Sequence, residues 1–186
     1  EFRRVLFRSV YPAGMTELES FAVALSHEAA RVALPFFRGD FAQEDKGGPG
    51  AFDPVTEADR AAERAMRDVL ARLRPDDAIL GEEYGASPGT SGLTWILDPI
   101  DGTRAFIAGQ AGFAHSLAVA EGHRIIAAVV HLPAMDLTFT ANADGPALLN
   151  GQPIRPSGAG IGGARVLTYK SATDPEHWKG GRVPPF

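Results

Sequence analysis

Two carboxylates lie three residues apart in the run Asp98-Pro99-Ile100-Asp101-Gly102-Thr103, directly after the apolar stretch Trp95–Leu97. If the chain turns between them, both can reach one point, because Pro99 fixes its own φ and Gly102 allows unusual values. Carboxylates and backbone carbonyls are hard oxygen ligands, which suit Mg²⁺ better than Zn²⁺. The free N–H groups of Gly102 and Thr103, where a short helix is predicted to start, could cradle a phosphate. Taken alone, a capped turn explains this run equally well.

Two further segments concentrate acidic residues. Glu82-Glu83 follows a short strand predicted at Ile79-Leu80, and these adjacent like charges fit either a metal ion or a solvated surface pair. The run Asp53–Asp59 fits a capped helix start on its own, because Thr56 is followed three residues later by Asp59. Considered together, the three acidic segments favour a divalent-cation site over three unrelated surface features.

The same segments resemble the inositol monophosphatase family, whose members are Mg²⁺-dependent, lithium-sensitive phosphatases. Asp53–Asp59, Gly81–Glu83 and Trp95–Thr103 carry the resemblance. Asn150–Ile154 is similar to a later hairpin of the family, and the resemblance extends from about Met15 to near the C-terminus. It implies a layered α+β sugar-phosphatase-like fold and a phosphoric monoester hydrolase.

The resemblance also implies roles for single residues. The Mg²⁺ ligands, for two or three ions in a full-length protein, would be Glu82, Asp98, Asp101 and the carbonyl of Ile100. The catalytic set would be Asp59 and Thr103, which orient the attacking water, together with Glu82. Substrate would contact Asp101 and the backbone of Gly102 and Thr103. Lys46 resembles a loop lysine near the outermost ion, and Glu83 matches a glutamate just behind the ligands.

The substrate implied by the resemblance is a small alcohol phosphate such as myo-inositol 1-phosphate, hydrolysed by metal-activated water in the cytoplasm. Thr103–Ile107 is more similar to bacterial histidinol-phosphate phosphatases and 3'(2'),5'-bisphosphate nucleotidases, so both activities are alternatives. A third alternative is an inactive fragment that only binds metal or phosphate.

One departure from the family concerns the C-terminal part. The family carries a further metal-binding aspartate in a Trp-Asp motif, whereas Trp178 is followed here by Lys179 and the chain stops at Phe186. We therefore expect a non-native leader at 1–14, an N-terminal α+β metal-binding domain at 15–160, and at 161–186 the start of a C-terminal α/β domain that is mostly missing. Apolar surface uncovered by that truncation would favour a homodimer.

Capping residues and apolar spacing predict the elements that position these segments. A capping box at Thr16 opens a helix that ends at Pro35, and a second helix runs from Thr56 to Pro75. An exposed mobile loop is predicted at 40–52 between them. Strands then follow at 79–80, 95–97 (covered on both faces), 116–120, 124–132, 137–141 and 166–169, with turn signals at 121–123, 133–136 and 150–151. This order favours an α+β fold with a largely antiparallel sheet.

The composition narrows the functional classes. The chain has 186 residues, 45% hydrophobic and 22% charged, with a net charge of -5 and no cysteine. The acidic balance argues against a nucleic-acid or anionic-lipid partner, and no apolar run approaches the ~18 residues that span a membrane. The histidines show no metal-ligand spacing and are predicted to be structural or exposed: His27, His115, His123, His131 and His177.

Overall fold

The computed structural model describes residues 15–39, 43–45, 54–160 and 174–177. The chain divides into two compact units, residues 1–154 and residues 155–186. Within the second unit the described residues include the short 3-10 turn η4 (Pro175–His177). The predicted strand at 166–169 and the predicted leader at 1–14 lie outside the described residues. No helix in the described part of the chain has the length and apolar character needed to cross a membrane.

The two long helices of the larger unit begin at the capping threonines that the sequence predicted. Thr16 caps α2 (Glu17–Ala33) and Thr56 caps α3 (Glu57–Leu73), and each threonine side chain accepts a bond from the third helical N–H. In return, the carboxylates of Glu19 and Asp59 accept from the N–H groups of the caps, which satisfies helix-end donors that otherwise lack partners. The 3-10 turn η1 (Leu34–Phe36) follows α2 at the predicted proline stop.

The main sheet has eight strands in the order β10-β9-β8-β7-β6-β5-β3-β4. Neighbouring strands are antiparallel except β3 and β5, which are parallel, so the predicted α+β fold with a largely antiparallel sheet is confirmed. Their bounds are β3 (Ala78–Gly81), β4 (Gly85–Ser87), β5 (Leu93–Asp101), β6 (Ala114–Glu121), β7 (Arg124–Leu132), β8 (Leu137–Asn142), β9 (Leu148–Leu149) and β10 (Gln152–Pro153).

A second, two-stranded sheet corrects part of the sequence prediction. β1 (Gln43–Asp45) pairs antiparallel with β2 (Pro54–Thr56), so three residues of the segment predicted as a loop at 40–52 form a strand. The pairing depends on residues on both sides of the segment, which local composition does not report. The rest of that segment lies outside the described residues.

Two turns that join neighbouring strands of the main sheet were predicted correctly. Glu121 pairs with Arg124 across the two-residue turn Gly122-His123 between β6 and β7. Asn150 and Gly151, between β9 and β10, have φ values of 47° and 76°, the left-handed pair that an Asn-Gly hairpin turn requires.

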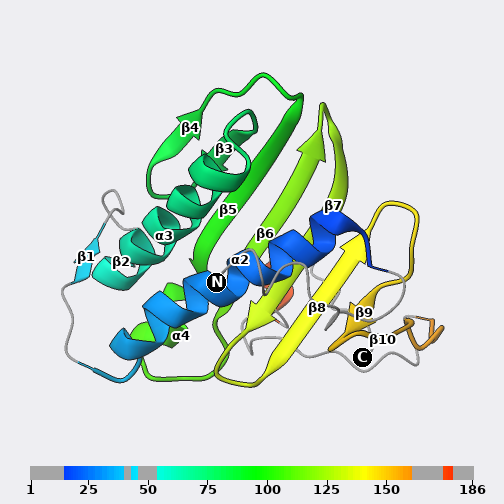
Figure 1. Ribbon diagram of the computed structural model, residues 1–186. Coiled ribbons are helices and arrows are strands. Elements are labelled where there is room, and N and C mark those ends of the chain that lie inside the picture. Colours follow the sequence, from blue (N-terminus) through cyan, green and yellow to red (C-terminus); the bar gives the residue numbers. More distant parts are fainter. Residues whose placement is uncertain (1–14, 40–42, 46–53, 161–173, 178–186) are drawn as a thin grey trace. The chain divides into compact units, whose positions relative to one another are not determined.

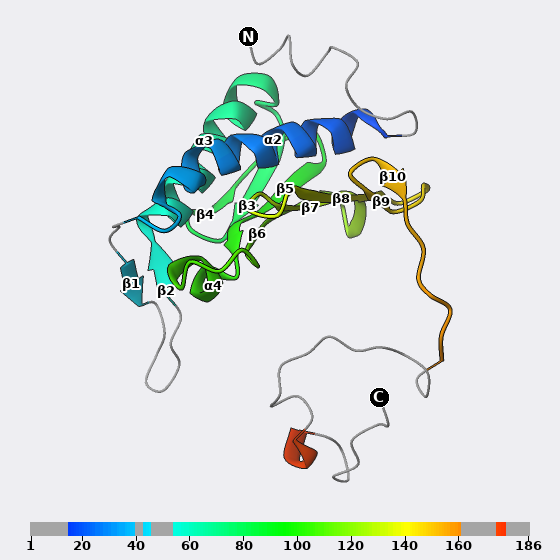
Figure 2. The same cartoon turned by 90° about the horizontal axis from the view of Figure 1, so that it is seen from below.

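Both long helices lie on the same face of the main sheet, as Figures 1 and 2 show, with α2 packed over β6, β7 and β8 and α3 over β5. We call this the helix face. Its core includes Trp95, which is fully buried, contacts Phe21 at 5.2 Å between ring centroids, and donates its indole N–H to Asp77 at 2.8 Å. Amphipathic spacing on α2 and α3 places their apolar stripes against these strands.

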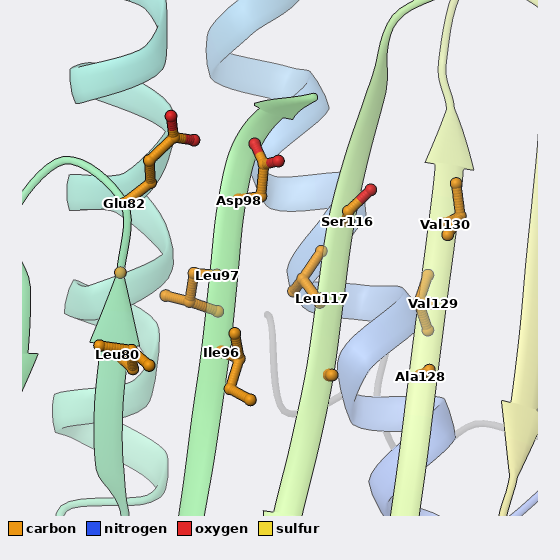
Figure 3. A pocket seen from close by; sticks show the side chains of 12 residues that line it. Leu80, Glu82, Ile96, Leu97, Asp98, Ser116, Leu117, Ala128, Val129 and Val130 are labelled. Atoms are coloured by element: carbon orange, nitrogen blue, oxygen red, sulfur yellow. The ribbon is translucent and has the colours of Figure 1, made fainter. Parts of the chain in front are cut away.

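Side chains alternate along β5 between the helix face and the opposite face. Trp95 and Leu97 are buried under the helices, whereas Ile96 is only partly buried and lines a hollow on the opposite face. The sequence predicted that residues 95–97 are covered on both faces. This is wrong within the described residues, because the described helices cover only the helix face of the strand. Leu80, Ile96, Ala118, Ala128 and Val130 form the apolar floor of the hollow, and Glu82 and Asp98 lie at one end of it (Figure 3).

Candidate active site

The 98–103 segment lies at the end of β5 and the beginning of α4 (Thr103–Ile107), not after the strand. The pairing of β5 with β6 shifts register between Asp98 and Asp101, which marks a β-bulge. Gly102 then caps α4 with φ 88°, the left-handed conformation that its lack of a side chain permits. The predicted tight turn is therefore a bulge followed by a left-handed glycine, and buried Phe106 anchors α4 edge-on against Phe113 at 4.9 Å.

Glu82 and Asp98 lie next to each other because their strands are parallel neighbours. Gly81 of β3 pairs with Leu97 of β5, and the N–H of Glu82 donates to the carbonyl of Leu97 at 3.1 Å. Both carboxyl groups extend from the same end of the opposite face (Figure 3). Glu82 is exposed, whereas Asp98 is half-buried and its Oδ1 atom is buried without a hydrogen-bond partner.

The environment of Asp98 strongly disfavours its negative charge. Burial raises the pKa of Asp98 to about 8, and the charges of Glu82 and Asp101, a hydrogen bond with Glu82 and the charge of Asp59 act in the same direction. Buried polar atoms normally find partners, so an unpaired carboxylate oxygen among like charges requires an explanation. A bound cation would relieve both the repulsion and the missing partner.

Asp101 completes a group of three carboxylates that we call the carboxylate centre: Glu82, Asp98 and Asp101. Asp101 pairs with Ala114 of β6 beyond the bulge, is exposed, and accepts a hydrogen bond from the hydroxyl of Ser116 at 3.2 Å. Its charge acts on the pKa of Asp98. Residues from two neighbouring segments of the sheet, the end of β3 and the end of β5, thus contribute to one negatively charged region.

Thr103 and Asp59, from helices far apart in the sequence, are also brought together. The Thr103 hydroxyl lies 3.4 Å from Oδ1 of Asp59 and 3.1 Å from the carbonyl oxygen of Ile100. The other oxygen of Asp59 accepts from the N–H of Thr56 at 2.8 Å and from the Thr56 hydroxyl. Burial raises the pKa of Asp59, although its bonds to Thr56 oppose the shift, and the charge of Glu82 adds to it. The capping carboxylate of α3 therefore keeps one oxygen directed toward Thr103.

The donor set of this region fits a hard divalent cation. Within the described residues, no three His, Asp or Glu side chains are grouped closely enough to hold an ion on their own. The carboxyl of Glu82, the unpaired oxygen of Asp98 and the backbone carbonyl of Ile100 are nevertheless oxygen donors of the kind Mg²⁺ prefers. The excess negative charge matches a cation, so the residues fit Mg²⁺ in donor chemistry and in charge.

Glu63 is a residue of the site that the sequence analysis missed. It lies on α3, is fully buried, and its carboxylate accepts the N–H groups of Glu83 at 2.7 Å and Tyr84 at 3.2 Å. A Cβ atom at Gly81 would collide with this carboxylate, so the glycine is needed for the close approach. Glu63 thereby holds the turn that presents Glu82.

Arg67 supports the same turn from the next turn of α3. Its Nε donates to Glu63 at 2.7 Å, and its other nitrogens donate to the hydroxyl of Ser87 at 2.9 Å and to the carbonyl of Gly85. Two features of the sequence could have identified Glu63. It lies four residues after Asp59 on the apolar side of the predicted helix, and four residues before Arg67.

The remaining residues singled out in the sequence fall into three groups. Lys46 and Asp53 lie outside the described residues. Glu83 is half-buried and its N–H faces Glu63, as described above. Among the histidines, His115 and His131 are buried on the helix face, whereas His123 and His177 are exposed.

Comparison with known sequences identifies the family. The sequence model of the inositol monophosphatase family matches residues 14–182, so the chain belongs to this family. The chain is 31% identical over 159 residues to a histidinol-phosphatase of Chlorobaculum parvum, a match that covers 83% of this chain and 59% of that protein. It is 44% identical over 107 residues to an inositol-1-monophosphatase of Rhizobium meliloti, covering 57% of this chain and 40% of that protein.

Solved structures agree with this assignment. An extragenic suppressor protein suhB from Bartonella henselae has a TM-score of 0.72 at 30% identity, over 77% of this chain and 56% of that one. An IMPase from Thermotoga maritima has a TM-score of 0.71 at 34% identity, over 77% of this chain and 55% of that one. The chain spans about half the length of the curated relatives it matches.

Proposed function

We propose that this chain carries the cation-binding part of a Mg²⁺-dependent phosphomonoesterase that hydrolyses a small alcohol phosphate such as myo-inositol 1-phosphate. One observation carries the proposal. The buried, unpaired oxygen of Asp98 lies beside Glu82, within electrostatic range of Asp59 and its neighbour Thr103. Membership in a family whose named relatives are phosphatases supports the same reaction class.

The carboxylate centre and the carbonyl of Ile100 would hold the cation. Phosphoryl transfer depends on positioning and on neutralising charge rather than on covalent help from the protein. When bound, Mg²⁺ supplies that charge and lowers the pKa of a coordinated water. The chain's own contribution is to place Glu82, Asp98 and Asp101 at the end of adjacent strands, with Asp98 half-buried so that its charge is available to a cation rather than to bulk water.

Thr103 and Asp59 would orient the attacking water. The Thr103 hydroxyl has one proton, which faces either Asp59 or the carbonyl of Ile100, and its lone pairs remain able to accept a hydrogen bond from water. Because the pKa of Asp59 is raised, its carboxylate is a better proton acceptor than an exposed aspartate. The backbone N–H groups of Gly102 and Thr103, at the start of α4, would bind the phosphate.

A second substrate is favoured by a specific observation. The match that covers 83% of this chain is to a protein named histidinol-phosphatase, and another of that name, from Mycobacterium tuberculosis, is 44% identical over 88 residues. Histidinol phosphate is therefore the first alternative substrate, followed by a 3'(2'),5'-bisphosphate nucleotide. The family resemblance adds inhibition by Li⁺ and a cytoplasmic location to this proposal, and exposed apolar surface would favour a homodimer.

Release of inorganic phosphate tests the proposal. Because the chain spans about half the length of its relatives, the assay uses both the 186-residue chain and the longest polypeptide its gene encodes. Each is incubated with the three substrates, with Mg²⁺ or with EDTA. We expect Mg²⁺-dependent release from one of them. Binding of Mg²⁺ or phosphate without turnover by either polypeptide would favour the binding-only alternative, and neither binding nor turnover would refute the proposal.

A further inference from the structure

The bulge in β5 leaves part of the site without the regular contacts of a strand. Asp98 pairs with Ser116 and Asp101 pairs with Ala114, so Pro99 and Ile100 together face the single residue His115 of β6. Such a bulge interrupts the ladder of backbone hydrogen bonds. Another group must therefore fix the peptide planes between Asp98 and Asp101, which set the direction of the carbonyl of Ile100.

The side chain of His115 supplies such a contact. The imidazole is fully buried, and its Nδ1 atom lies 2.5 Å from the carbonyl oxygen of Pro99. A carbonyl can only accept, so Nδ1 must carry the hydrogen and donate it. The Nε2 atom is then a bare acceptor, and it is buried without a partner. The contact with Pro99 therefore selects the tautomer of His115 that carries its hydrogen on Nδ1.

Neighbouring rings restrict the orientation of this imidazole. Phe113 packs edge-on against it at 6.2 Å between centroids, and His131, its cross-strand partner on β7, lies at 5.9 Å. His131 is in turn stacked on His27 of α2 at 4.6 Å. The ring of His115 therefore cannot turn away from Pro99 without disturbing the core, which makes it a rigid support.

We propose that His115 is a positioning residue: by holding the carbonyl of Pro99 on the helix face, it turns the carbonyl of Ile100 toward Thr103 and the carboxylate centre. The carbonyls of Pro99 and Ile100 belong to adjacent planar peptide units, so fixing the first restricts the orientations open to the second. The carbonyl of Ile100 does lie 3.1 Å from the Thr103 hydroxyl, which donates to it. This inference rests on the proposed function for its effect on cation binding, but not for the contact itself.

Three variants of the 186-residue chain separate positioning from simple packing. His115→Leu removes the donor and fills the space, whereas His115→Asn keeps a nitrogen donor at the position of Nδ1. His131→Leu is the matched control, because it removes the other buried imidazole of the same face and leaves the bond to Pro99 intact. Thermal unfolding of each variant shows that it is folded, and the affinity for Mg²⁺ is measured by titration calorimetry.

For the wild type, ¹⁵N NMR should show the hydrogen of His115 on Nδ1. We expect His115→Leu to weaken Mg²⁺ binding about 10- to 100-fold, as is usual when a group that orients metal ligands is removed. His115→Asn should recover most of the affinity, and His131→Leu should bind as the wild type does. A hydrogen on Nε2, or equal losses in His115→Leu and His131→Leu, would overturn the proposal.

A metal-independent measurement distinguishes this inference from the proposed function. Backbone amide shifts of Asp98 and of residues 100–103 are recorded without metal for all four chains. If the wild type does not bind Mg²⁺, the proposed cation site fails, but shifts that move in His115→Leu and return in His115→Asn would still establish the positioning contact. Unchanged shifts in His115→Leu would refute it.

Discussion

The two faces of the main sheet use adjacent residues of the same strands for opposite purposes. On the helix face, Trp95 of β5 and His115 of β6 are fully buried, and each makes one short hydrogen bond. On the opposite face, Asp98 of β5 belongs to the carboxylate centre and has one oxygen without a partner, and Ser116 of β6 donates to Asp101. A strand period of two therefore separates a packed core from a polar site by a single residue.

Burial shifts pKa values in opposite directions on the two faces, because one holds imidazoles and the other carboxylates. On the helix face it lowers the pKa of His115 and of His131 to about 4, which keeps both rings neutral. On the opposite face burial raises the pKa of Asp98 to about 8, and neighbouring carboxylates add to the shift. Neutral imidazoles are compatible with a closed core, whereas clustered acids require protons or a cation. The contrast reflects the groups that each face holds, because burial disfavours the charged form of an acid and of an imidazole alike.

The largest expected effect is on activity at the opposite face. Asp98→Asn should lower Mg²⁺-dependent phosphate release by at least about 10³-fold, because metal charge stabilisation contributes several kcal/mol. The same variant should unfold at a higher temperature than the wild type in EDTA, since it removes carboxylate repulsion. Ile96→Val, two residues earlier on the same face, is the control. Wild-type activity in Asp98→Asn would contradict the assignment of this face.

The next prediction compares how much two adjacent residues of β5, one on each face, contribute to stability. Trp95→Ala should destabilise the chain by about 3–5 kcal/mol, the usual cost of removing a buried aromatic ring. Ile96→Ala should cost clearly less, because this side chain is only partly buried. Urea unfolding of both variants measures the difference. Equal losses would show that the opposite face is covered as tightly as the helix face.

Glu63 connects the two faces, since it lies on α3 but holds the turn that bears Glu82. Glu63→Gln places an amide N–H where the wild type has an acceptor for Glu83, Tyr84 and Arg67. We expect Mg²⁺ affinity to fall about 10- to 100-fold, measured by calorimetry. Glu19→Gln, another fully buried glutamate but bonded to Thr16 and Asn142, is the matched control. Similar losses of affinity in both variants would indicate general destabilisation.

The last prediction concerns the pH dependence of stability without metal. Because the folded pKa values of His115 and His131 lie below 6.5, the unfolded state binds more protons as pH falls from 6.5 toward 4, and stability is lost. For Asp98 the folded pKa lies above 3.8, so stability is lost as pH rises from about 4 to 8. Each group contributes a slope of about 1.4 kcal/mol per pH unit at most.

We therefore expect stability in EDTA to be highest near pH 6.5. In urea titrations, Asp98→Asn should reduce the loss above that pH, and His131→Gln should reduce the loss below it. If Asp98→Asn leaves the loss above pH 6.5 unchanged and His131→Gln leaves the loss below it unchanged, the pKa contrast between the two faces is wrong.

Local sequence was sufficient to place several elements and to propose candidate site residues. Thr16 and Thr56 were sufficient to place both helix starts, because a capping box involves only four neighbouring residues. Asn150-Gly151 predicted its turn for the same reason. The carboxylates at 82, 98 and 101 could be selected because residue type and spacing within short segments limit the chemistry available to them.

Other features depend on contacts between distant segments, and only the tertiary structure decided them. The parallel pairing of β3 with β5 places Glu82 beside Asp98, and the bulge places His115 opposite Pro99. A histidine or an acid on an apolar stripe carries no local signal of the carbonyl or amide that it will meet. The amino-acid sequence thus determined which groups could bind a cation, whereas the order of strands and the packing of α3 decided which of them face one another and which other side chains hold them there.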